Sequence, residues 1–176
     1  MSGRALITGG AGFIGAHLSR RLLDDGWEVT LVDNLSRGVQ DTALASLRER
    51  PGFALHVADL RDPSTLGSIP TDHTHVLHFA ALLGVQNVID RPSAVLRENV
   101  ALLETMLDVA SAQSSLERFL FPSTSEVYAG TQQFHDLPFP TPEDTPLTVS
   151  ALDRPRTSYM LSKIYGEALV HHSGLP

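Results

Sequence analysis

The 176-residue sequence contains no cysteine, which excludes a disulfide framework, a thiolate nucleophile and thiolate metal ligands. It also lacks any apolar run near the roughly 18 residues that a membrane span needs. The apolar run that follows the first four residues is too short for a signal peptide. We therefore expect a cytoplasmic protein with no membrane partner.

Positive charge is scarce, with 13 basic residues against 20 acidic ones and a net charge of −7 at pH 7. Neither nucleic acid nor an anionic membrane favours a surface of its own sign, so both are excluded as main partners. A small anionic ligand held by a local feature stays possible. Lysine is scarcer still, because Lys163 is the only one in the chain.

The length and composition predict one soluble globular domain over residues 1–176, with 42% hydrophobic and 19% charged residues. Apolar runs bounded by turn residues alternate with segments of helical periodicity. This order predicts a doubly wound, Rossmann-type parallel sheet with helices on both faces. The predicted strands are 4–8, 28–33, 53–57, 75–79 and 117–121, and the predicted helices are 13–25, 41–50, 91–112 and 156–171. Residues 59–69 are expected to form a polar loop or short helix, and residues 122–155 a long functional loop.

Glycines are concentrated between the first predicted strand and helix, where Thr8 to Gly15 reads Thr-Gly-Gly-Ala-Gly-Phe-Ile-Gly. The spacing Gly9-x-x-Gly12-x-x-Gly15 in this context is typical of dinucleotide binding. The first glycines allow a tight turn, Gly12 lets the backbone approach a pyrophosphate, and Gly15 permits close packing of helix on strand. The alternative is a glycine-rich turn without a ligand.

Asp33 closes the second predicted strand, where its carboxylate can accept hydrogen bonds from an adenosine ribose and repel a 2′-phosphate. This favours NAD over NADP, although Arg37 leaves room for NADP. The alternative is an aspartate that caps a turn together with Asn34.

Tyr159 and Lys163 lie one turn apart on one face of the last predicted helix. An ammonium near the phenol, together with a positive nicotinamide ring, favours the phenolate and moves the tyrosine pKa toward neutrality. The alternative is an ordinary surface pair. No metal site is expected, because His73 and His75 share one strand face while His78 points to the other, which is typical of packing residues.

Together these motifs resemble the extended short-chain dehydrogenase/reductases of the NAD-dependent epimerase/dehydratase family, whose members modify nucleotide sugars. The resemblance covers essentially the whole chain. Besides the glycine turn and the Tyr159-x-x-x-Lys163 pair, it rests on Asp33 to Ser36, Asp59 to Leu60, His78 to Ala81, Asn99 to Val100, and Ser123 to Tyr128.

The resemblance implies a cofactor role for many of these residues. Asp59 and Leu60 would flank the adenine, and Ala80 and Ala81 would pass beneath the cofactor. The other implied NAD-binding residues are Gly9, Gly12, Phe13, Ile14, Gly15, Asp33, Asn34, Phe79, Asn99, Tyr159 and Lys163.

The resemblance also implies the catalytic roles. Thr124 would hydrogen-bond the sugar hydroxyl that Tyr159 deprotonates, and Lys163 would hold the nicotinamide ribose. Glu126 stands where simple 4-epimerases usually have a small or hydroxyl residue, and the motif is most similar to UDP-glucuronate decarboxylases. A carboxylate there can take the C5 proton of a 4-keto intermediate or assist loss of a C5 carboxylate. The alternative is that Glu126 caps the loop after the fifth strand.

Departures from the family pattern open a second hypothesis. Leu102 and Leu103 fill space where the family has small residues, and the sequence from Val127 to Gly130 predicts a different loop path. We also expect the chain to lack the family's C-terminal substrate-binding segment. The chain is therefore expected to be the N-terminal part of an NAD-dependent epimerase, decarboxylase or dehydratase acting on a UDP-linked nucleotide sugar, or an NAD-binding module without independent turnover.

The resemblance finally implies a homodimer through the helices 92–112 and 156–171. Both carry apolar stripes that would face the second subunit. These residues are Leu96, Leu103, Met106, Leu107, Met160, Ile164 and Ala168.

Overall fold

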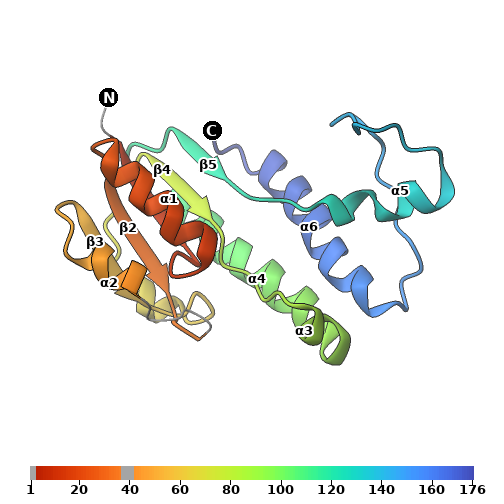
Figure 1. Ribbon diagram of the computed structural model, residues 1–176, viewed down its shortest axis with the longest axis horizontal. Helices are drawn as coiled ribbons and strands as arrows, with labels where there is room; N and C mark the ends of the chain where they lie inside the picture. Colours follow the sequence, from red (N-terminus) through yellow and green to blue (C-terminus); the bar gives the residue numbers. More distant parts are fainter. Residues whose placement is uncertain (1–2, 37–41) are drawn as a thin grey trace. The chain divides into compact units, whose positions relative to one another are not determined.

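The computed structural model describes residues 3–36 and 42–176 and contains a five-stranded sheet in the order β3-β2-β1-β4-β5 (Figure 1). All four strand pairings are parallel. The sequence prediction of a doubly wound parallel sheet is confirmed. The strands are β1 (Arg4–Thr8), β2 (Glu28–Asp33), β3 (Phe53–Val57), β4 (His75–His78) and β5 (Arg118–Leu120).

The helices follow the predicted order, with small changes at their ends. They are α1 (Phe13–Asp24), α2 (Thr42–Arg48), α4 (Pro92–Ser111) and α6 (Pro155–His172), with a 3-10 helix at Pro63–Leu66. Three short elements were not predicted: α3 (Val85–Asp90), a 3-10 helix at Ser125–Tyr128 and α5 (Ala129–Phe134). The expectation of one long loop over residues 122–155 is therefore wrong in its first part, where the 3-10 helix and α5 lie.

Helix α5 was not predicted from the sequence because tertiary packing, and not a local sequence pattern, stabilises it. Its sequence has no apolar repeat and contains Gly130, which weakens a helix interior. In the structure Gly130 is buried, and a Cβ there would collide with the carbonyl oxygen of Thr148. A close contact between segments distant in sequence thus fixes the helix.

The described residues form two compact units. One comprises residues within 1–81, 101–122 and 173–176 and holds the sheet; the other comprises 82–100 and 123–172 and holds α3, α5 and α6. The expectation of one domain over residues 1–176 stays a prediction.

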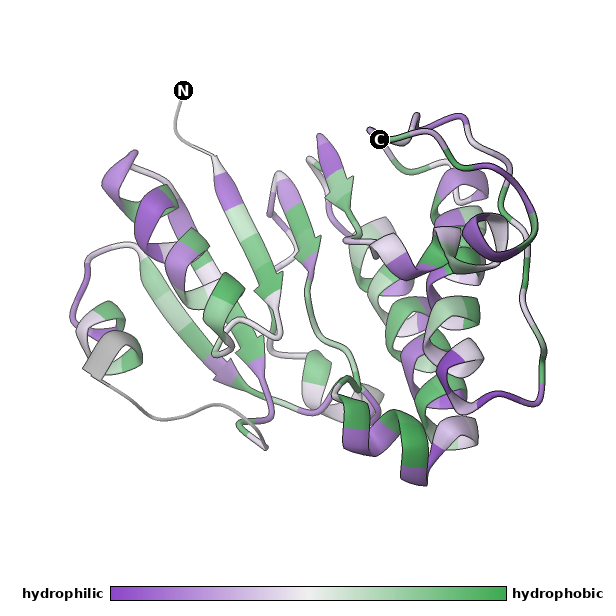
Figure 2. Cartoon of the chain, turned by 45° about the vertical axis from the view of Figure 1, so that its right-hand side comes forward, coloured by the Kyte–Doolittle hydropathy of each residue, from purple (hydrophilic) through white to green (hydrophobic). Residues whose placement is uncertain are grey.

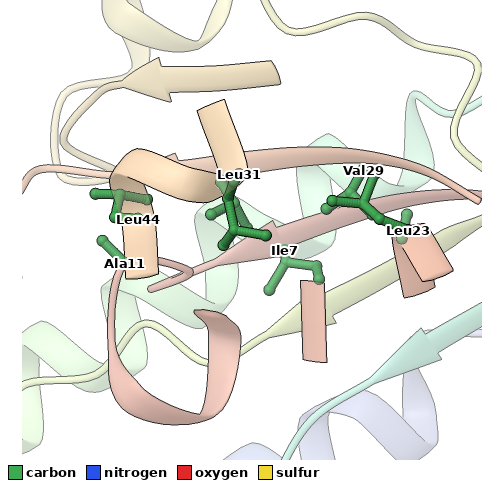
Figure 3. Packing of buried hydrophobic residues seen from close by; sticks show 8 residues of the cluster. Ile7, Ala11, Leu23, Val29, Leu31 and Leu44 are labelled. Atoms are coloured by element: carbon green, nitrogen blue, oxygen red, sulfur yellow. The ribbon is translucent and has the colours of Figure 1, made fainter. Parts of the chain in front are cut away.

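The core of the sheet unit lies between the strands and the helices α1 and α2 (Figure 3). The strands are largely hydrophobic along their length (Figure 2), and alternate residues point to the same face. Burying each large aliphatic side chain contributes about 1.5–3 kcal/mol. The cluster consists of Ala5, Ile7, Ala11, Leu23, Val29, Leu31, Leu44 and Leu47.

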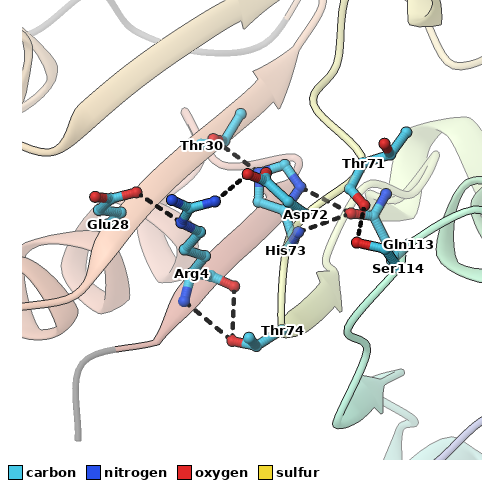
Figure 4. A network of polar contacts seen from close by, with 9 residues as sticks. All are labelled: Arg4, Glu28, Thr30, Thr71, Asp72, His73, Thr74, Gln113 and Ser114. Carbon is cyan, nitrogen blue, oxygen red and sulfur yellow. Dashed lines mark hydrogen bonds and ion pairs between the residues drawn. The ribbon is translucent and has the colours of Figure 1, made fainter.

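His73 lies just before β4, so it does not share a strand face with His75 as predicted. Its Nδ1 lies 3.0 Å from the Gln113 Oε1, and its Nε2 lies 3.0 Å from the Thr30 hydroxyl. Nearby, Arg4 donates its backbone N–H to Thr74 and pairs with acidic side chains (Figure 4). This buried histidine joins segments at the amino end of the sheet.

Two negative findings concern only residues 3–36 and 42–176. No helix there is both long and apolar enough to cross a membrane. No three histidine or acidic side chains gather there as a metal site would require.

Candidate functional site

The glycine turn joins β1 to α1 and leaves no space for side chains at two positions. Gly9 has φ +64°, and a Cβ there would lie 2.6 Å from the backbone nitrogen of Ala80. A Cβ at Gly15 would lie 2.5 Å from the Cα of Gly10. Gly12 precedes the first turn of α1, and a Cβ there would approach only the Gly9 carbonyl oxygen, at 3.2 Å. The turn therefore presents bare backbone at a helix N-terminus, which suits a pyrophosphate.

Two apolar side chains follow the turn and point into solvent. Phe13 is 81% exposed and Ile14 is 59% exposed. Burying such side chains against a ligand is favourable. Their exposure fits the cofactor role that the sequence assigns to them.

The Asp33 carboxylate is tied to the same turn. It accepts hydrogen bonds from the backbone N–H of Ala11 at 3.0 Å and from that of Leu35 at 2.8 Å. Asp33 therefore does cap a turn, as the alternative proposed, and it also holds the glycine turn in place. Each oxygen keeps a further lone pair that a ribose hydroxyl can use. Arg37 lies outside the described residues.

Asp59 follows β3 beside Asn34. Its carboxylate accepts a hydrogen bond from the Asn34 side-chain amide at 3.2 Å and pairs with the Arg61 guanidinium at 2.6 Å. The hydrogen bonds from Arg61 hold the pKa of this carboxyl well below its usual range. Leu60 is buried. Sequence reasoning missed Arg61, although its place two residues after Asp59 is a usable signal.

The segment after β4 runs close to β1. Phe79 donates its N–H to the Thr8 carbonyl oxygen at 3.0 Å, and Ala80 donates to the Thr8 hydroxyl at 3.4 Å. The same hydroxyl lies 2.7 Å from Nδ1 of the buried His78. Thus Phe79 and Ala80 lie next to Gly9 of the glycine turn, and the contact of Phe79, Ala80 and the half-buried Ala81 with a cofactor stays a prediction.

In the second unit, Asn99 is buried and its amide pairs with the backbone. It accepts a hydrogen bond from the Leu82 N–H at 2.7 Å and donates to the Leu82 carbonyl at 3.1 Å. The Ser162 hydroxyl lies 3.4 Å from its amide nitrogen. Asn99 therefore fixes the chain before α3, and its predicted contact with the cofactor stays a prediction.

Tyr159 and Lys163 lie in α6, with the ammonium nitrogen 5.9 Å from the tyrosine ring centre. Lys163 is only 6% exposed, so the alternative of an ordinary surface pair is wrong. Burial lowers the pKa of Lys163 to about 8, while the Glu167 carboxylate acts in the opposite direction. A lysine this deeply buried is expensive to keep charged, which is typical of functional sites.

The groups of this chain alone shift the pKa of Tyr159 upward, and the lowering predicted for the tyrosine together with a positive nicotinamide ring stays a prediction. Burial raises the pKa of Tyr159, and the Glu126 carboxylate raises it further. Both effects disfavour the phenolate. The positive charges of Lys163 and of a nicotinamide ring, which would favour the phenolate, are thus opposed by burial and by the Glu126 carboxylate.

Thr124 and Glu126 lie at the start of the second 3-10 helix. The Thr124 hydroxyl accepts a hydrogen bond from the Glu126 N–H at 3.3 Å and so caps this helix. Thr124, and not Glu126, therefore caps the segment after β5. The Glu126 carboxylate lies close enough to Tyr159 to raise the pKa of the tyrosine. The structure brings together Thr124, Glu126, Tyr159 and Lys163 in one unit.

Sequence reasoning missed two residues beside this cluster. The Ser123 hydroxyl donates a hydrogen bond to the Glu167 carboxylate. Glu167 lies four residues after Lys163, so the helical repeat that joins Tyr159 to Lys163 also points to it.

Comparisons with known proteins agree with this arrangement. The family model described as "NAD dependent epimerase/dehydratase family" matches residues 5–174. A UDP-N-acetyl-alpha-D-glucosaminuronate decarboxylase of Bacillus cytotoxicus is 32% identical over 96% of this chain and 49% of its own length. UDP-glucuronate 4-epimerase 2 of Arabidopsis thaliana is 30% identical over 94% of this chain and 37% of its own length.

Solved structures give the same picture. The UDP-Glc/GlcNAc 4-epimerase of Campylobacter jejuni superposes with a TM-score of 0.79 and 26% identity, over 98% of this chain and 49% of that one. The enzyme WbmG of Bordetella bronchiseptica, solved in complex with NAD, superposes with a TM-score of 0.77 and 27% identity, over 100% of this chain and 51% of that one. The chain thus spans about half the length of these similar proteins, or less.

Proposed function

Because the chain belongs to the NAD-dependent epimerase/dehydratase family, we propose that it is the cofactor-binding and catalytic part of an enzyme that modifies a UDP-linked nucleotide sugar through transient oxidation at C4. The observation that carries this proposal is the burial of Lys163, the only lysine, one helical turn from Tyr159 on the helix against which the 3-10 helix with Glu126 packs. Keeping a lysine charged at such a buried position is costly, which is typical of functional sites.

NAD would bind across the glycine turn of the sheet unit. The turn presents backbone without side chains at the N-terminus of α1, and Asp33 offers the ribose a carboxylate that a 2′-phosphate would meet unfavourably. We propose that the adenine lies beside Asp59 and Leu60. The remaining proposed NAD-binding residues are Gly9, Gly12, Phe13, Ile14, Gly15, Asn34, Phe79, Ala80, Ala81, Asn99, Tyr159 and Lys163.

Tyr159 would accept the proton of the sugar C4 hydroxyl, and Thr124 would orient that hydroxyl. When bound, NAD supplies the hydride acceptor and a positive nicotinamide ring. Because burial and Glu126 raise the pKa of Tyr159, the chain's own groups hold the tyrosine protonated. Lys163 and the ring charge together favour the phenolate only in the loaded enzyme.

Glu126 would act as a second acid/base after the oxidation. A C4 ketone acidifies the C5 proton, and a carboxylate is a suitable base for it. The similar proteins include epimerases, a decarboxylase and a 5,6-dehydratase. We favour decarboxylation or dehydration over simple 4-epimerisation because Glu126 lies close enough to Tyr159 to affect its pKa.

We also propose a cytoplasmic homodimer through α4 and α6, with a narrower contact surface than the sequence indicated. Leu103, Met106 and Met160 are at most 2% exposed, so they are unavailable to a partner. The stripe residues left for a second subunit are Leu96, Leu107, Ile164 and Ala168.

A second candidate function is an NAD-binding module without turnover of its own. It is favoured by the share of the similar proteins that the chain covers, which is about half or less. A turnover assay separates the two candidates: the NAD-loaded protein is incubated with UDP-, GDP- and dTDP-sugars, with and without a candidate C-terminal partner, and the products are analysed by mass and NMR. A product under either condition supports the enzyme, and NAD binding without any product supports the module.

A further inference from the structure

We propose that Glu167 is a positioning residue for the Tyr159 and Lys163 pair, which it serves by anchoring the Ser123 loop to α6 and by holding a negative charge beside the lysine. The proposal rests on the proposed function, since it assigns Glu167 to the same site. It goes beyond the proposed function because neither the glycine turn nor the Tyr-x-x-x-Lys spacing assigns a role to Glu167.

The helical repeat places three side chains in one row. Tyr159, Lys163 and Glu167 follow each other at intervals of four residues along α6. Such residues are neighbours on one face of a helix. Lys163, in the middle of the row, is 6% exposed, and Tyr159 and Glu167 on either side of it are half-buried.

A hydrogen bond ties this row to the loop that carries the other two catalytic candidates. The Ser123 hydroxyl donates to the Glu167 carboxylate, and Thr124, the next residue, caps the 3-10 helix that contains Glu126. That 3-10 helix packs against α6. Glu167 therefore fixes the loop at its first residue, directly before Thr124.

The charge of Glu167 acts against the cost of burying the lysine. Burial lowers the pKa of Lys163 to about 8, and the Glu167 carboxylate raises it. Removing this carboxylate would remove an effect that raises the pKa of Lys163, so a larger share of the lysine would be neutral near pH 7. A neutral amine cannot support a phenolate electrostatically.

The other charged groups near this row affect the pKa of tyrosines and not that of Lys163. Glu126 raises the pKa of Tyr159, and Glu143 lies 3.5 Å from the Tyr128 hydroxyl. Tyr128 has its pKa raised by burial and by the carboxylates of Glu143 and Glu167. On α3, which packs against α6, the charged residue Asp90 is exposed. Glu167 is thus the carboxylate that acts on the lysine.

The single lysine allows a direct test. In protein made with isotope-labelled lysine, Lys163 gives the only lysine side-chain signal, and its chemical shift against pH reports its pKa. The titration needs neither NAD nor sugar, so its result is independent of whether the proposed function holds. We expect a pKa of about 8 in the unmodified protein and a value roughly one unit lower in Glu167→Gln.

The matched control is Glu104→Gln, which removes the same charge from an exposed position on α4 and should leave the Lys163 titration unchanged. Glu167→Asp keeps the charge and should retain most of the unmodified pKa. Ser123→Ala keeps the glutamate but frees its carboxylate, and we expect a smaller fall than in Glu167→Gln. Should Glu167→Gln fail to fold, the Ser123→Ala titration decides the question alone. Equal Lys163 pKa values in the Glu167→Gln, Ser123→Ala and unmodified proteins would overturn the proposal.

Discussion

The Asp33 carboxylate, at the end of β2, accepts a hydrogen bond of 3.0 Å from the backbone N–H of Ala11 in the turn that begins α1. A strand-end carboxylate and the glycine turn are therefore one structural unit. A ligand bound at the turn would therefore lie close to the Asp33 carboxylate, which holds the turn in place. This link makes Asp33 relevant both to the stability of the turn and to the choice of cofactor.

The first prediction concerns that choice. NAD should bind more tightly than NADP, because the Asp33 carboxylate would repel a 2′-phosphate. Asp33→Ala should narrow the gap, and it should also lower the free energy of unfolding by about 1–3 kcal/mol for each of the Ala11 and Leu35 N–H groups that stays unpaired. Titration calorimetry measures both affinities. Equal affinity of the unmodified protein for NAD and NADP would contradict the role of Asp33.

The second prediction concerns the turn itself. Gly9→Ala should destabilise the fold by several kcal/mol, because φ is +64° and the new Cβ would lie 2.6 Å from the Ala80 nitrogen. Gly26→Ala is the matched control: its φ is +81°, but nothing lies within 4 Å of the new Cβ. It should cost only about 1 kcal/mol. Urea unfolding checks both, and similar losses would show that strain alone, without the close approach, governs Gly9.

The third prediction uses the pH dependence of stability. The pKa of Lys163 is about 8 in the folded protein, against 10.5 as its ordinary value. Between these values the unfolded chain binds more protons, so this lysine makes the free energy of unfolding rise as pH increases from 8 toward 10.5. The total rise is on the order of a few kcal/mol. Below pH 8 the cost of the buried charge is present in full.

Lys163→Met provides the comparison for that pH dependence. It should raise the free energy of unfolding near pH 7 and remove the part of the pH slope that belongs to the lysine, as measured by urea unfolding at several pH values. The same slope in the unmodified protein and in Lys163→Met would show that Lys163 does not titrate as described.

The fourth prediction concerns the second acid/base. Glu126→Gln should leave C4 oxidation in place but stall chemistry at C5, so that a 4-keto intermediate and reduced nicotinamide accumulate. Glu143→Gln, which removes an exposed carboxylate near Tyr128, is the control and should not trap the ketone. Product formation by Glu126→Gln at the unmodified rate would favour simple 4-epimerisation.

The sequence predicted the parts of the molecule that local chemistry controls. The apolar runs that form the five strands and the glycine turn between β1 and α1 were predicted correctly, because buried parallel strands and glycine-rich turns have strong local patterns. Helix α5 was missed because contact between Gly130 and the Thr148 segment stabilises it, and no local pattern records such a contact.

The electrostatics of the site were the least predictable part. The spacing of Tyr159 and Lys163 is visible in the sequence, but the burial that raises one pKa and lowers the other depends on tertiary packing. The same holds for Glu167, whose partner Ser123 lies far away in sequence. Leu103 was predicted to face a second subunit, but it is buried within the chain. An apolar repeat on a helix does not distinguish a core face from an interface.

The central claim is that Tyr159 takes a proton from a nucleotide sugar as hydride leaves for NAD. Its most direct test is the absorbance of reduced nicotinamide after the NAD-loaded protein is mixed with a UDP-sugar, with a candidate C-terminal partner present. The account predicts a transient signal in the unmodified protein, its loss in Tyr159→Phe with NAD binding nearly intact, and its retention in Tyr165→Phe, which changes an exposed tyrosine of the same helix. An equal signal in Tyr159→Phe, or none from any sugar although NAD binds, would contradict it.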